Sequence, residues 1–375
     1  MATSLNLVNI FLPFFVFDIS PYPLQTTLLW VGIITGSASL IAAVMSPFWG
    51  SLSHRFNPKL LYLRAFLSNS IAIFLMGFAT NLHTLLILRI LQGVMAGTST
   101  IGLIIVSSSS PRDRITSDIG FFQSSQTLGQ LVGPPLGSFA VVLLGYKGAF
   151  IGASALMFAS FIFCYLYVAD VPPLPKKERT RGRISLNKRV MVGWALCFVA
   201  MIQLTFLPSV LPKVFEAFHV ESKDALRLAG IVVMVYTVTA LVGTYVWSRL
   251  AKTVGLYKMI TFLLASGILF QSLLAFSGGV VSFTVIRMIQ TGLVAAVFAL
   301  SISIFAREPE GSVIGFLNSS RFAGNSLGPI LATSVLAISN LTVLYFVIAA
   351  ITLVIFLCFR FLFKSPVVST RGVRI

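Results

Sequence analysis

Apolar runs of about 20 residues recur along this chain, and each is long enough to cross the hydrocarbon core of a bilayer. Only 10% of the residues are charged and the mean hydropathy is +0.96, so the chain lacks the polar surface that a soluble domain needs. A segment in lipid must satisfy its own backbone hydrogen bonds, which favours helices. We therefore predict an all-α polytopic membrane protein. Its twelve predicted spans lie near residues 2–18, 27–48, 60–80, 84–107, 119–144, 147–168, 190–213, 227–248, 258–278, 281–305, 313–337 and 341–362.

The positive charge of the chain predicts its orientation in the membrane. There are 27 Lys and Arg residues against 10 Asp and Glu, a net charge of +17. If the first loop is external, most of the basic residues fall in the loops and tail on the opposite side. Because cytoplasmic loops carry such an excess, we predict a multi-pass protein of the inner (plasma) membrane with both termini in the cytoplasm. The charge is then a mark of topology, and nucleic acid is not an expected partner.

The chain also repeats itself at a nearly constant offset, which indicates a duplicated fold. We predict six-helix bundles at 1–168 and 190–363, a basic cytoplasmic linker at 169–189 and a cytoplasmic tail at 364–375. A shift of 198 residues pairs Trp49 with Trp247, Arg89 with Arg287, and Gln92 with Gln290. A shift of 195 residues pairs Gly120 with Gly315, Gly129 with Gly324, Gly133 with Gly328, and Pro134 with Pro329.

Two parallel six-span repeats joined in the cytoplasm are typical of secondary transporters, whose substrate site lies between the halves near the middle of the membrane. The repeat also predicts that the first helix is truncated. Span seven begins near Arg189, whose partner under the shift of 198 would precede Met1. Either the true start lies upstream, or this is a shortened copy.

The fifth predicted span contains glycines at positions 129, 133 and 137 and two adjacent prolines. Residues four apart share one face of a helix, and small residues there let another helix approach closely. Pro134 and Pro135 bend the helix. We interpret this face, and its counterpart in the eleventh span, as a smooth bent surface along which the two halves move past each other. The alternative is static helix packing.

Three motifs give the chain a family resemblance. The loop after span two reads "GSLSHRFNPK" and keeps Gly50 and Arg55, and span four contains "LRILQGVMAG" with Arg89. Span five matches a signature with Gly120, Gly129, Gly133, Pro134 and Gly137, followed by Ser138. In these motifs the chain resembles the major facilitator superfamily, and within it the twelve-span drug:proton antiporters. The resemblance implies alternating-access efflux of hydrophobic or amphipathic small molecules in exchange for protons.

Charged residues within or beside the spans are the candidates for coupling. Arg89 must face the protein interior, a partner or water, and the resemblance implies a part in proton coupling. Its counterpart Arg287 is expected to have a structural role. Asp18, at the outer end of the first span, is the best candidate for a proton carrier, because burial can raise the pKa of a carboxyl group. No acidic residue lies in the middle of a span.

A substrate cavity is expected to combine aromatic side chains with a few polar groups. Arg321 stands where the first half has Gln126, and it is a candidate to meet an anionic substrate or a coupling carboxylate. The alternative is that most of these aromatic residues face lipid or neighbouring helices. The cavity candidates are Phe14, Phe122, Gln123, Gln126, Gln203, Tyr236, Arg321 and Asn325.

The loop after span two departs from the family pattern at His54, where the family has an aspartate. A neutral histidine can pair only weakly with arginine or with the positive end of a helix. We predict that the cytoplasmic latch formed by Gly50, Arg55 and their neighbours is weak. Crosslinking that finds the inner mouth closed at rest would contradict this.

The sequence contains no nucleotide-binding loop, no metal-ligand cluster and no nucleophile paired with a base, so we expect neither an enzyme nor a cofactor. The three cysteines lie in apolar spans without the spacing of metal ligands. The expected partners are a small-molecule substrate, protons and lipid, and the protein is expected to be monomeric. Two alternatives stay open: a transporter of an anionic metabolite that uses Arg89 and Arg321, and a non-transporting or decayed copy.

Overall fold

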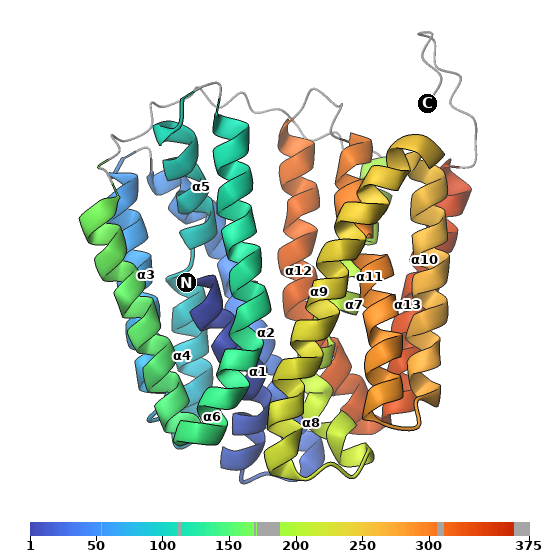
Figure 1. The fold of residues 1–375 in the computed structure, drawn as a ribbon, viewed down its shortest axis with the longest axis horizontal. Helices are drawn as coiled ribbons and strands as arrows, with labels where there is room; N and C mark the ends of the chain where they lie inside the picture. The colour runs from blue at the N-terminus through green and yellow to red at the C-terminus, as the bar shows by residue number, and fades with distance from the viewer. Residues whose placement is uncertain (54, 112–113, 169, 171–187, 306–310, 364–375) are drawn as a thin grey trace. The chain divides into compact units, whose positions relative to one another are not determined.

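The computed structural model describes residues 1–53, 55–111, 114–168, 170, 188–305 and 311–363, and the regular structure of these residues is helical (Figure 1). The first half contains α1 (Ala2–Ile19), α2 (Leu24–Leu52), α3 (Pro58–Met76), α4 (Leu82–Val94), α5 (Thr98–Ser109) and α6 (Ile115–Tyr167). The second half contains α7 (Lys188–Thr205), α8 (Leu207–Ala217), α9 (Ser222–Val254), α10 (Leu256–Leu273), a short 3-10 helix (Leu274–Phe276), α11 (Val280–Phe305), α12 (Gly311–Ile338) and α13 (Leu341–Phe363).

Every predicted span falls on a helix, but two of the predicted spans, the fourth and the seventh, are broken into two helices. Span four is two helices, α4 and α5, separated by residues 95–97. Span seven is also two helices, α7 and α8, which meet at an angle of 40°. Spans five and six together make up α6, which turns back at Gly145, in the predicted gap between them, where φ is 69° and ψ is 173°. At 1.5 Å per residue a straight helix of 53 residues would be about 80 Å long, far more than a bilayer requires. Figure 1 shows α6 reversing its direction.

Length and composition identify many of these helices as membrane spans. Among the described residues, eight helices are long and apolar enough to cross a membrane, or nine if α7 and α8 count as one broken span. The prediction of an all-α polytopic membrane protein is therefore confirmed. The number twelve stays a prediction.

Contacts between Cα atoms divide the chain into two compact units. Unit 1 contains Met1–Arg179 and Pro208–Met234, and unit 2 contains Thr180–Leu207 and Val235–Ile375. This division differs from the predicted bundles in one respect, because α8 and the first part of α9 group with unit 1. The predicted domain boundaries stay predictions.

Within unit 1, α1 packs along α6, α3 packs against α6, and α2 packs against α4. Small residues make the contact of α2 with α4 close. A Cβ atom on Gly93 would lie 2.7 Å from the carbonyl oxygen of Ala38, so the two backbones meet directly. Helices in lipid associate through close packing of this kind, because moving an apolar side chain from lipid to a helix contact gives no hydrophobic stabilisation.

Within unit 2, α7 packs against α12, and α10 lies beside α11 and α13 (Figure 1). Its core is an apolar cluster from α7, α9, α10, α11 and α13, in which Leu263, Val294 and Phe359 are almost completely buried.

A hydrogen bond shows that the repeat in the sequence is also a repeat in the structure. The indole Nε1 of Trp49 donates to the carbonyl oxygen of Val94 at 2.7 Å. In unit 2, Trp247 donates in the same way to Gly292 at 3.0 Å. Both pairs are related by the shift of 198 residues, so each half ties its second span to its fourth through the same contact.

Candidate functional site

The glycine face of α6 packs against α1. A Cβ atom on Gly129 would lie 2.7 Å from the Cβ of Ala2, and one on Gly133 would lie 2.9 Å from the carbonyl oxygen of Thr3. A Cβ atom on Gly137 would collide with the carbonyl oxygen of Leu7. These three glycines therefore form a seam within unit 1. The prediction that they form the surface between the two halves needs correction.

Another part of the glycine and proline signature of α6 contacts α9, which belongs to the second repeat. Ser138 and the carbonyl oxygen of Pro134 lie against Gly230 of α9, where an added Cβ would be 2.9 Å from that oxygen. Both segments belong to unit 1. The hydroxyl of Ser138 also donates to the Pro134 carbonyl at 3.1 Å, a bond within the helix that favours bending. Gly120, which opens the signature, lies near the start of α6.

The corresponding seam of unit 2 lies between α12 and α7. A Cβ atom on Gly328 would lie 2.6 Å from Oγ1 of Thr205, and one on Gly324 would collide with Met201. The hydroxyl of Thr333 donates to the Pro329 carbonyl at 3.0 Å, as Ser138 does to Pro134. The bent helix with a glycine face is thus present in both units, and in each it packs on the first helix of its own repeat.

Arg89 is buried in unit 1, where all of its hydrogen-bond acceptors are neutral. Its Nε donates to the carbonyl oxygen of Ile34 at 3.1 Å, and its Nη1 donates to Oε1 of Gln92 at 2.8 Å. Its Nη2 donates to the carbonyl of Thr35 at 3.2 Å and to Oδ1 of Asn9 at 3.3 Å. Among the described residues, no carboxylate forms an ion pair with this guanidinium. We define these side chains, Asn9, Arg89 and Gln92, as the Arg89 cluster.

Arg287 occupies the equivalent place in unit 2 and is completely buried. Its Nη1 donates to Oε1 of Gln290 at 2.6 Å, which repeats the bond between Arg89 and Gln92. Its guanidinium carbon lies 4.9 Å from the ring centre of Phe206 and 5.0 Å from that of Tyr236. Two aromatic rings therefore cover this arginine, and stacking of this kind stabilises a cation away from water.

Two of the predicted cavity residues belong to this covered group. Gln203 is completely buried, and its Nε2 donates to Oγ1 of Thr352 at 2.7 Å. Its Oε1 accepts a hydrogen bond from Nε2 of Gln290 at 2.5 Å. Tyr236 is 5% exposed and stacks on Arg287. Both residues are part of the packed interior of unit 2, where they satisfy polar partners.

The remaining cavity candidates are more accessible. Gln123 on α6 is exposed, whereas Phe14, Phe122 and Gln126 are half-buried. On α12, Arg321 and Asn325 are half-buried, and Oδ1 of Asn325 has no hydrogen-bond partner among the described residues. Their role in binding a substrate stays a prediction.

The acidic candidate Asp18 lies at the end of α1 and is exposed. The prediction that Asp18 carries the proton rests on the expectation that it is buried, and the structure does not show that burial. Glu216, the other acidic residue at the outer end of a span, pairs with Lys213 at 2.5 Å and is also largely exposed.

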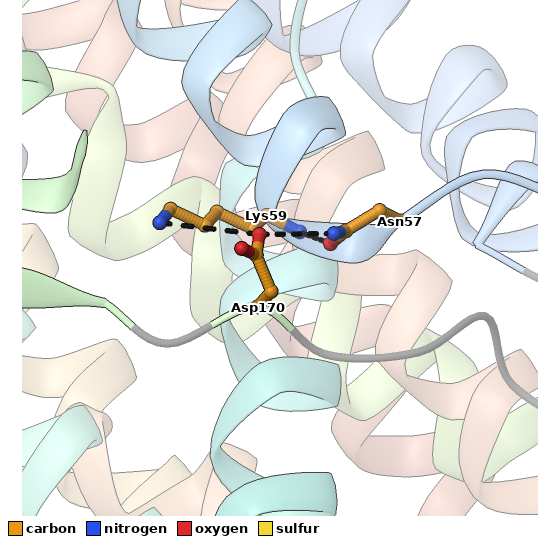
Figure 2. Close-up of polar contacts among 3 residues, drawn as sticks. All are labelled: Asn57, Lys59 and Asp170. Carbon is orange, nitrogen blue, oxygen red and sulfur yellow. Dashed lines mark hydrogen bonds and ion pairs between the residues drawn. The ribbon is translucent and has the colours of Figure 1, made fainter.

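The loop after span two is held by an acid from the end of span six (Figure 2). The side chain of Asn57 accepts from the backbone N–H of Lys59 at 2.8 Å, which caps α3, and its Nδ2 donates to Asp170 at 3.0 Å. Nζ of Lys59 lies 3.9 Å from the same carboxylate. His54 lies outside the described residues, Arg55 is exposed, and a Cβ atom added to Gly50 would lie 3.4 Å from Cγ2 of Thr100. The predicted weakness of this latch stays a prediction.

Arg64 holds the break in span four, and sequence reasoning missed this role. Its Nη2 donates to the carbonyl oxygens of Met95 and Ala96, both at 3.2 Å, and these groups end α4. Its guanidinium carbon lies 3.2 Å above the ring of Trp49. Gly97 has a φ of 114°, which other residues rarely adopt, and an added Cβ would touch Trp49. The available signal was the departure from the repeat, since Phe262 and Ala295 stand in the second half where Arg64 and Gly97 stand in the first.

Comparison with known proteins defines the class. The sequence model of the Major Facilitator Superfamily matches residues 1–288 and 193–374 of the chain, which therefore belongs to this superfamily of membrane transporters. The multidrug resistance protein MdtG of Yersinia enterocolitica is 25% identical over 94% of this chain and 87% of its own length. MdtG of Proteus mirabilis is 26% identical over 93% and 90%. The crystal structure of the nucleoside transporter NupG superposes with a TM-score of 0.73 at 17% identity, covering 98% of this chain and all of NupG.

Proposed function

We propose that this transporter exports hydrophobic or amphipathic small molecules across the inner membrane in exchange for protons, by alternating access. The relatives named as multidrug resistance proteins extend over nearly the whole chain, which supports the class of substrate. The direction of export and the exchange for protons follow from the antiporter signature in α6.

The observation that carries the proposal is the contact of this signature with α9. Gly230 comes from the second repeat and meets the backbone carbonyl of Pro134 and the small side chain of Ser138. A contact between backbone and one small side chain can slide, whereas large interdigitated side chains resist sliding. The bent part of α6 is therefore suited to a transporter whose parts must move against each other.

Accumulation of a fluorescent amphipathic dye tests the proposal. Energised cells that produce the chain are expected to retain less dye than cells with an empty vector, and an uncoupler is expected to abolish the difference. Equal dye content with and without the chain would contradict the proposal. A carrier of anionic metabolites would leave the dye unaffected and move labelled acids, and a decayed copy would do neither.

Asp18 and Arg89 are the proposed coupling residues. If Asp18 carries the proton, Asp18→Asn is expected to abolish proton-driven exchange but to leave substrate binding intact. Proton release from the purified protein on addition of substrate measures the first effect, and dye binding measures the second. Unchanged exchange in this variant would remove Asp18 from the mechanism, and the exposure of this residue makes that test the first to perform.

A further inference from the structure

Within the part of unit 1 that the structure describes, no acidic side chain forms an ion pair with Arg89. Arg89 is 4% exposed, and the four acceptors of its guanidinium are two backbone carbonyls and two side-chain amides. A buried cation that pairs only with neutral groups retains its full charge in a medium of low dielectric constant. Such a site is prepared for an anion.

A second observation in the same cluster points to a missing acceptor. Nε2 of Gln92 is buried and has no hydrogen-bond partner among the described residues. In unit 2 the corresponding Nε2, of Gln290, donates to Gln203, whereas the first half has Leu5 at the position of Gln203. The amide donor beside the arginine is thus satisfied in unit 2, where only Nε of Arg287 in this group lacks a partner among the described residues, whereas in unit 1 the amide donor itself is left free.

Asn9 connects the cluster to an accessible surface. It lies in the middle of α1 and is exposed, unlike the buried Ile34 and Gln92 and the half-buried Thr35. An amide in the middle of a span is costly against lipid, so this side chain faces an aqueous path or a substrate. The N–H···O bond of 3.3 Å from Arg89 to Asn9 is the longest that this guanidinium makes, and it is therefore the easiest for an incoming acceptor to replace.

We infer that the Arg89 cluster binds the anionic group of the substrate, and that Asn9 determines this preference through its lack of charge. The inference rests on the proposed function and narrows its substrate class to amphipathic compounds that carry a carboxylate or a similar anion. A carboxylate accepts two parallel hydrogen bonds from a guanidinium, which neither amide can match. Arg287 does not serve this purpose, because the rings of Phe206 and Tyr236 cover its guanidinium.

Changing Asn9 to aspartate tests this inference, because the two side chains have nearly the same shape. In Asn9→Asp a carboxylate of the protein lies next to Arg89 and competes with that of the substrate. Export of carboxyfluorescein, loaded into cells as its ester, is compared with export of the cationic dye ethidium by the same variant. We expect the ratio of the anionic to the cationic rate to fall by about tenfold or more, because close charge pairs couple strongly.

Two further variants separate charge from structure. Asn9→Ala removes the amide without adding charge, so it is expected to change the two rates by similar factors. Gln92→Glu adds a carboxylate on the other side of the guanidinium and is expected to lower the ratio as Asn9→Asp does. An unchanged ratio in both acidic variants would overturn the inference, since a general loss of folding lowers both rates together.

The wild-type protein distinguishes the two levels of the proposal. Export of ethidium without export of carboxyfluorescein would overturn the anionic preference and leave the proposed efflux function standing. Export of neither dye would overturn the efflux function itself. Export of carboxyfluorescein that outpaces that of ethidium, and that the acidic variants reverse, is the expected result.

Discussion

Gly137→Leu is expected to separate α1 from α6 and to lower the midpoint of thermal unfolding in detergent by roughly 10 °C. An added Cβ would collide with the backbone carbonyl of Leu7, and a backbone atom cannot turn away as a side chain can. Overpacking of a close contact costs about 1–3 kcal/mol, occasionally more, and 1 kcal/mol shifts the midpoint of a unit the size of unit 1 by about 2–4 °C. Fluorescence-detected size-exclusion chromatography after heating measures the shift.

The same helix offers a matched control. Gly152 also lies in α6, but nothing lies within 4 Å of the position of its Cβ. Gly152→Leu is therefore expected to leave the midpoint within a few degrees of the wild type. If both variants lost stability equally, the effect would come from glycine itself rather than from the seam between α1 and α6.

Arg64→Ala is expected to destabilise the break in span four by about 3 kcal/mol, because carbonyl oxygens at a helix end that lose a charged donor are costly in lipid. The affected groups are the carbonyls of Met95 and Ala96 at the end of α4. The expected measurement is a fall of roughly 10 °C in the midpoint of unfolding in detergent. An unchanged midpoint would show that water or lipid headgroups satisfy these carbonyls instead.

The second half of the chain suggests how to repair this damage. There the ring centres of Phe262 and Trp247 lie 5.8 Å apart, and α11 continues without a break through Ala295. The double variant Arg64→Phe with Gly97→Ala copies that arrangement. It is expected to recover most of the stability that Arg64→Phe alone loses, because alanine favours a continuous helix in which Met95 and Ala96 bond within the backbone. A double variant no more stable than the single one would contradict this account.

The membrane class, the helical fold and the repeat were predictable from the sequence, because they depend on residue patterns that extend over many positions. Hydropathy locates the spans, and the shift of 198 residues correctly paired Arg89 with Arg287 and Trp49 with Trp247. The break at Gly145 lies in the predicted gap between spans five and six, but the breaks after Val94 and after Thr205 were missed, because apolar composition does not change where a helix bends inside lipid.

The candidate site was harder to predict, because it depends on which neighbour each residue contacts. Gly137 has the spacing of a packing face, but that spacing does not show whether the partner is α1 or the other half. Gln203 is polar and near the middle of a span, which fits both a cavity and a buried network, and only the contact with Gln290 decides between them. Asn9 was overlooked because it is neutral, although its neutrality is what leaves the charge of Arg89 unbalanced.

The contact of Asp170 with Asn57 and Lys59 has a practical consequence for work on this protein (Figure 2). It joins Asp170, at the start of the linker, to the N-terminal end of α3, so this contact lies entirely within the first half of the chain. A gene split in the linker after Asp170 would keep all three residues of this contact on the first polypeptide. Producing the two parts as separate chains is therefore a practical way to give each its own isotope or spin label before they reassemble.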